Sequence, residues 1–152
     1  MSFDPTQFLD MQITEANDTV ARPVPVGEYT AIITAYELRS WAAKDDPSKT
    51  GLALDLKWEI DSPELVAELG RKPTVKQGIM LDMSPDQTGL DMGKGRNVGL
   101  GRLREAVGKN RPGQPFSFSM LPGNAARIVV SHRVDKNNSE NVYSEVKSVA
   151  AI

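Results

Sequence analysis

A long run of residues that favour β-structure dominates the first third of the chain. Between Glu28 and Arg39, six residues are β-branched or aromatic, types that suit a pleated surface: Tyr29, Thr30, Ile32, Ile33, Thr34 and Tyr36. A strand of twelve residues spans roughly 40 Å, at about 3.3 Å per residue. In a small domain a strand this long usually bends and serves two sheets or both sides of a barrel.

The segment Gly51–Ile60 carries the clearest alternation in the chain. Its leucines, Trp58 and Ile60 alternate with Ala53 and three charged residues, which predicts a strand with one buried and one wet face. We therefore expect Trp58 in the core. The connection Ala42–Thr50 is polar and charged, so the two strands predict a long hairpin with a flexible tip.

The remainder of the chain predicts short helices and three more strands. Ser62 before Pro63 begins a short helix that Gly70 ends, and Asn97 caps a second helix that extends to Val107. The predicted strands are Thr74–Met83, Ala125–Asp135 and Asn141–Val149. The fold class is therefore mainly β, with five strands and one or two short helices.

Composition limits the function classes. A chain of 152 residues favours one domain, and the absence of cysteine excludes disulfides and thiol chemistry and fits a reducing cytosol. No apolar run approaches 18 residues, and the N-terminus lacks the basic start and apolar middle of a signal peptide, so we expect no membrane segment. Residues 1–22 hold four acids and no base before Arg22; we expect a flexible acidic arm, or one that docks on its own domain or a partner, ahead of a domain at 23–152.

Catalytic motifs are nearly absent. The one histidine, His132, lies in a predicted strand and is expected to be structural. The Gly-Lys of Gly93–Lys94 lacks the Ser or Thr that a phosphate-binding loop needs next. Asp82, Asp86 and Asp91 could ligate a divalent ion, although loop carboxylates are usually solvated. We therefore expect a protein that is not an enzyme and needs no metal or cofactor.

Basic and aromatic residues form the pattern that does point to a function. They gather in three places: Lys94–Arg111, the first hairpin, and the last hairpin with Arg133, Tyr143 and Lys147. Aromatic faces stack unpaired bases while basic residues follow the phosphates, so the pattern is typical of single-strand binding. Trp41, at a strand end beside a charged loop, is the better stacking candidate of the two tryptophans.

The order of several short motifs resembles a family of bacteriophage proteins related to single-stranded DNA-binding proteins. These motifs, spread over roughly residues 22–149, are Pro25-Val26-Gly27-Glu28-Tyr29-Thr30-Ala31-Ile32-Ile33, Lys49-Thr50-Gly51, Gly70-Arg71-Lys72, Leu103 with Ala106-Val107-Gly108, Pro122-Gly123 and Asn141 to Lys147. The resemblance implies an OB-fold-like barrel that binds single-stranded DNA with little sequence preference. The chain departs from many single-strand binders because its C-terminus carries no run of acids.

The resemblance implies a protein that coats and protects single strands during replication or recombination in the cytoplasm of a bacterial host. The expected DNA contacts are Tyr36, Arg39, Trp41, Lys44, Lys49, Lys57, Lys76, Arg96, Arg133 and Tyr143. Further expected partners are phage or host replication and recombination proteins, and a second copy paired through an exposed edge of the first strand. The alternative is a non-catalytic β-barrel that serves as a phage structural part or a protein-interaction module.

Overall fold

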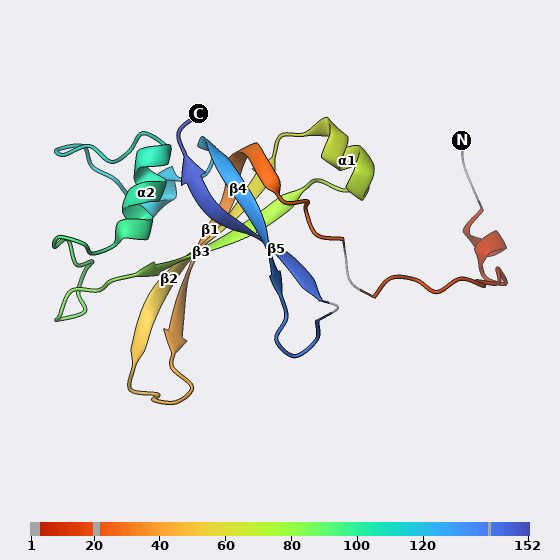
Figure 1. The fold of residues 1–152 in the computed structure, drawn as a ribbon, viewed down its shortest axis with the longest axis horizontal. Helices are drawn as coiled ribbons and strands as arrows, with labels where there is room; N and C mark the ends of the chain where they lie inside the picture. The colour runs from red at the N-terminus through yellow and green to blue at the C-terminus, as the bar shows by residue number, and fades with distance from the viewer. Residues whose placement is uncertain (1–3, 20–21, 140) are drawn as a thin grey trace.

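Five strands form one ring-like sheet in the computed structural model, which describes residues 4–19, 22–139 and 141–152 (Figure 1). The strands are β1 (Gly27–Ala42), β2 (Thr50–Ile60), β3 (Thr74–Leu81), β4 (Ala125–Val134) and β5 (Val142–Ala150). Their spatial order is β1-β2-β3-β5-β4, and β4 pairs back onto β1. The prediction of a mainly β, OB-fold-like barrel with small helices is confirmed.

The first strand bends, as its length predicts. Residues Gly27–Ile32 pair with β4, whereas Ala31–Ala42 pair with β2, and the register with β2 shifts between Ile33 and Ala35. Such a bulge increases the local twist and lets one strand serve both sides of a barrel. Beyond this point the β1–β2 hairpin leaves the barrel, and it projects on the same side as the β4–β5 hairpin (Figure 1).

Short helices lie in the connections between strands: α1 (Pro63–Leu69), α2 (Val98–Ala106) and the single 3₁₀ turn η2 (Phe118–Met120). A further 3₁₀ turn, η1 (Pro5–Phe8), lies in the N-terminal arm. The amide of Leu65 donates to Ser62 Oγ at 3.3 Å, and Gly70 ends α1 with a φ of 69°, so both predicted signals act as expected. Among the described residues, no helix has the length and apolar character needed to cross a membrane.

Asn97 stands at the predicted start of the second helix, but the prediction that its side chain caps the helix is wrong. Asn97 precedes α2, but it adopts a left-handed conformation (φ 52°) and its side chain makes no capping hydrogen bond. Its amide group instead bonds the backbone of Asp82 and Asp91, and Asn97 is only 7% exposed. The side chain therefore ties the loop before α2 to the end of β3 because those buried backbone groups need partners.

The core lies inside the ring. The leucines, Trp58 and Ile60 of β2 face the core as predicted, but Ala53, expected on the wet face, is also completely buried. Trp58 is completely buried, and its indole N–H donates to Gln77 Oε1 at 2.9 Å. In contrast, residues 4–19 are exposed throughout and extend away from the barrel (Figure 1). The rest of the predicted arm, at 1–3 and 20–21, lies outside the described residues, and the boundary at residue 22 stays a prediction.

Candidate nucleic-acid interface

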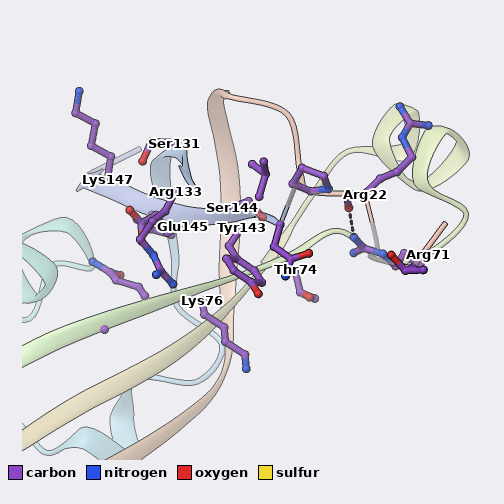
Figure 2. Close-up of a pocket in the computed structure, with 17 residues that line it drawn as sticks. Arg22, Arg71, Thr74, Lys76, Ser131, Arg133, Tyr143, Ser144, Glu145 and Lys147 are labelled. Atoms are coloured by element: carbon purple, nitrogen blue, oxygen red, sulfur yellow. Dashed lines mark hydrogen bonds and ion pairs between the residues drawn. The ribbon is translucent and has the colours of Figure 1, made fainter. Parts of the chain in front are cut away.

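The ring is most weakly closed between β3 and β5. Within the described part of the chain these strands share one parallel residue pair, Lys76 with Glu145, while β1 and β2 pair over the whole length of their hairpin. An open groove of about 1160 Å³ follows this seam. Its walls are β3, β5, the end of β4, and the segments just before β1 and β3, as Figure 2 shows.

The groove is positively charged. Its ionisable lining consists of five basic side chains and one acidic side chain: Arg22, Arg71, Lys76, Arg133, Lys147 and Glu145. The acid is already engaged, because Arg133 Nε lies 3.3 Å from Glu145 Oε2. The formal charge of the lining is therefore +4, in a chain whose net charge is −2.

Three of these basic groups keep their charge free for a ligand. Lys76 and Lys147 make no ion pair with any residue that the structure describes. Arg71 Nη2 donates to the backbone oxygen of Arg22 at 2.6 Å, and this neutral acceptor fixes the guanidinium without cancelling its charge. Figure 2 shows this pair at one end of the groove, beside α1.

Tyr143 supplies the aromatic surface of the groove. It lies on β5 directly opposite Arg133 of β4, and the guanidinium carbon of Arg133 is 5.5 Å from the centre of the Tyr143 ring. A cation over an aromatic face at this distance is attractive and holds the ring in place. Because Tyr143 is 41% exposed, the ring remains accessible for stacking from solvent.

A second groove of about 360 Å³ continues the first across the outer face of the β1–β2 hairpin. Both grooves share Lys76, Gln77 and Gly78, so they meet on β3. Lys57 lies directly opposite Lys76 on β2, and Gly78 has no side chain to block the passage. The path therefore extends from the seam to Lys57 and Glu37 on the hairpin.

Of the charged and aromatic residues predicted from the sequence, four gather along this path: Lys57, Lys76, Arg133 and Tyr143. Tyr36 borders the second groove, but its cross-strand partner is Leu56, so its side chain shares the face opposite to Lys57.

The other cations of the first hairpin lie off the path. Arg39 is on the same face of the hairpin as Lys57, but it is bonded to Asp55 at 2.8 Å, and this hydrogen bond raises the pKa of Arg39 further. Lys44 and Lys49 are exposed in the β1–β2 connection, and neither lines a groove of the interface.

Trp41 and Arg96 lie together elsewhere, in a separate hollow of about 550 Å³. The Trp41 ring covers Gly51 so closely that a Cβ there would lie 2.6 Å from it. Arg96 donates to Asp91 Oδ2 at 3.1 Å and lies 3.7 Å from Asp82 Oδ1. Neither residue lines the seam groove, and the charge of Arg96 is already matched by its own loop.

Sequence reasoning did not select Arg22, Arg71 or Lys147 as contacts. Lys147 was visible as part of the basic set on the last hairpin, but no spacing rule connects it to Arg71, which follows α1. The two residues share a groove only because β3 and β5 become neighbours when the ring closes. Arg22 reads in sequence as the end of the acidic arm, and its position at the groove is likewise a consequence of the fold.

The other candidate residues have structural roles. Asp82 and Asp91 hold Arg96 and Asn97, and Asp86 accepts hydrogen bonds from Ser84 and Thr88 that lower its pKa to about 2. In the part of the chain that the structure describes, no three acidic or histidine side chains gather as a metal site would require. His132 Nε2 lies 2.6 Å from the backbone oxygen of Val24, which ties β4 to the segment before β1.

Comparison of the chain with models of known protein families found no match, and comparison with curated proteins found no similar sequence. The geometry and charge of the two grooves are therefore the features of this chain that bear on its function.

Proposed function

We propose that the protein binds single-stranded DNA along the two joined grooves, and that it coats and protects such strands during bacteriophage replication or recombination. The observation that carries the proposal is the pair Lys57 and Lys76, which lie directly opposite each other where the grooves meet. Like charges directly opposite in a sheet are destabilising. A bound polyanion would neutralise both lysines and relieve their repulsion, and this relief would favour binding.

Of three acids near this pair, Glu37 borders the second groove without an ion pair to a described residue, and the other two are already engaged. Asp55 is bonded to Arg39 at 2.8 Å, and Glu59 lies 3.9 Å from Lys72 Nζ. Neither lysine makes an ion pair with a described residue. The phosphates of a nucleic acid would supply the missing counter-charge, and their binding would release condensed counterions.

The lining also favours a single strand and little sequence preference. Cations in the groove would contact phosphates, which carry no base identity. Tyr143 offers a ring on which an unpaired base can stack, and such stacking tolerates any base. A duplex keeps its bases stacked on one another, so it could not use this ring in the same way.

The test is a titration of fluorescein-labelled oligo-dT, and of a matched duplex, followed by anisotropy at several salt concentrations. An external label is needed because Trp58 is buried and Trp41 lies outside the seam groove. We expect binding of the single strand well above that of the duplex. The logarithm of the binding constant should fall with the logarithm of salt concentration, with a slope of about −0.7 per phosphate contact, or about −3 for four contacts.

Absence of binding at low salt, or equal binding of the duplex, would contradict the proposal. The alternative of a non-catalytic structural or protein-interaction barrel would then take its place, and a flat salt response would accompany it.

A further inference from the structure

The β1–β2 hairpin leaves one edge of β1 open. The backbone of Ile33 bonds to Gly123 and Asn124, and the pairing of β1 with β4 ends at Ile32. From there, among the described residues, β1 pairs with β2 alone, and every residue from Thr34 to Ser40 is exposed. Figure 1 shows this part of the hairpin projecting clear of the barrel.

The direction of the backbone groups along this edge follows from one hydrogen bond. The amide of Ala43 donates to the backbone oxygen of Lys49 at 2.9 Å, so the peptide groups of Ala43 face β2. In an antiparallel ladder alternate residues face the partner, so Arg39 and Glu37 also face β2. Tyr36, Leu38 and Ser40 therefore direct their N–H and C=O groups to the open side.

Such an edge is a template for another strand. Proteins usually blunt an exposed edge with proline, lysine or a covering element, yet residues 34–42 contain neither proline nor lysine. Two apolar side chains are exposed on this segment, with Tyr36 at 39% and Leu38 at 45%. The edge is thus long, partly apolar and without a strand partner in the described part of the chain.

We propose that this edge pairs with the same edge of a second copy, antiparallel about a two-fold axis at Leu38. Leu38 would then face Leu38 of the second copy, and Tyr36 would face Ser40, through about six backbone hydrogen bonds. The two sheets become continuous, and the exposed apolar side chains of both copies are covered. The pairing requires no DNA, although Tyr36 and Glu37 also border the second groove of the proposed interface.

Charge selects this register over its neighbours. An axis at Leu38 places Glu37 opposite Arg39 of the second copy, twice in the symmetric pair. An axis at Glu37 places Glu37 opposite Glu37 of the second copy, and an axis at Arg39 places Arg39 opposite Arg39. Like charges face each other in both of these registers. Glu37 makes no ion pair with a residue that the structure describes and acts on Arg39 of its own chain only through a weaker electrostatic interaction, so its carboxylate can accept the arginine of the second copy. Arg39 already holds Asp55 at 2.8 Å.

The test is sedimentation equilibrium of the full chain, without DNA, from low micromolar to several hundred micromolar protein. We expect a monomer–dimer equilibrium in the native sequence. Glu37→Arg faces arginine against arginine and should weaken the dimer by at least about ten-fold. The double variant Glu37→Arg with Arg39→Glu restores opposite charges across the two-fold axis. The arginine introduced at position 37 lies directly opposite Asp55 of its own chain and can pair with it, so the dimer should return.

Leu38→Pro provides a second, independent variant. The Leu38 amide faces the open edge, so proline in both copies should remove the two central intermolecular bonds while the β1–β2 ladder keeps its own bonds. Circular dichroism checks that this variant folds. A native chain that stays monomeric throughout the concentration range overturns the proposal, as does a dimer that survives both Glu37→Arg and Leu38→Pro in folded protein.

Discussion

Two regions of the molecule look alike in sequence and differ in structure. The loop before α2 and the seam between β3 and β5 both carry basic residues among small or polar ones. In the loop, Arg96 is held by Asp82 and Asp91, and Asn97 closes the same network. In the seam groove, Arg133 is paired with Glu145 and Arg22 lies 3.4 Å from Glu68, while Arg71, Lys76 and Lys147 make no ion pair with a described residue.

The difference shows why the number of basic residues is a poor guide to a binding surface. A cation bonded to acids of its own loop stabilises that loop. Those acids also neutralise its charge, so an approaching anion is attracted only weakly. A cation without a partner costs self-repulsion in the free protein and lowers the energy of a bound anion. We therefore expect substitutions in the seam to change DNA binding and substitutions in the loop to change stability.

The largest effect is expected from reversing two free charges of the groove. The double variant Lys76→Glu with Lys147→Glu replaces two phosphate contacts with two repulsive charges, so affinity for oligo-dT should fall by roughly 100-fold. The double variant Arg102→Glu with Arg111→Glu is the matched control, since it changes net charge equally at exposed sites outside the seam groove. Anisotropy at fixed salt measures both. An equal loss in the control would mean that affinity follows net charge rather than the groove.

Substitutions of Asn97 are expected to lower the stability of the fold and to leave DNA binding unchanged. The side chain of Asn97 makes three hydrogen bonds to backbone groups of Asp82 and Asp91, and its backbone N–H donates to Asp82 Oδ2. All four bonds are 2.7–2.9 Å long. Asn97→Ala removes the partner of the part-buried Asp82 N–H and Asp91 oxygen and places a β-carbon without a local hydrogen bond at positive φ, so the free energy of unfolding should fall by about 2–3 kcal/mol. Urea denaturation measures this loss.

Asn97→Gly separates the two causes, because glycine tolerates the left-handed conformation but cannot restore the bonds. It should be destabilised less than Asn97→Ala. Both variants should bind oligo-dT as the native chain does. Weaker binding by a stably folded Asn97 variant would mean that the loop takes part in the interface.

Much of the fold was predictable because its signals are local. Alternating apolar residues identify β2, the run of β-branched residues identifies β1, and Ser62 and Gly70 delimit α1. Asn97 shows the limit of this reasoning. Asparagine before an apolar stripe favours a cap, but the side chain of Asn97 instead bonds backbone groups of Asp82, just after β3, and of Asp91 in the loop, and these tertiary bonds determine its conformation.

The candidate site was less predictable because ring closure assembles it. Lys57, Lys76, Arg133 and Tyr143 were selected from the sequence, and the strand order brings them to one path. The same sequence reasoning also selected Trp41 and Arg96, since spacing does not reveal that Trp41 covers Gly51 or that Arg96 has two acids beside it. Their predicted contact with DNA stays a prediction, with a smaller expected effect.

Tyr143→Ala is expected to reduce affinity for oligo-dT less than the double variant Lys76→Glu with Lys147→Glu does. Removal of one stacking ring should weaken binding of oligo-dT by roughly ten-fold, within the range of about 1–3 kcal/mol per stacked base. Tyr143→Phe is the control, because it keeps the ring beside Arg133 and should bind nearly as the native chain does. The salt slope should stay unchanged in both variants, since no phosphate contact is lost. A reduced slope in Tyr143→Ala would mean that the ring acts by positioning Arg133.

The smallest effect is expected from the acids of the loop. The Ser84 hydroxyl, and then the hydroxyl and amide of Thr88, lower the pKa of Asp86 from 3.8 to about 2. Because the folded pKa is lower than the unfolded one, this group stabilises the fold above about pH 4, and the contribution is lost as the pH falls towards 2. The stability difference between the native chain and Asp86→Asn should therefore narrow over that interval. Carboxyl chemical shifts measure the pKa directly: Ser84→Ala should raise it, and a pKa near 3.8 in the native chain would contradict the hydrogen-bonded turn. DNA binding should be the same in both variants, since Asp86 lines neither groove of the interface.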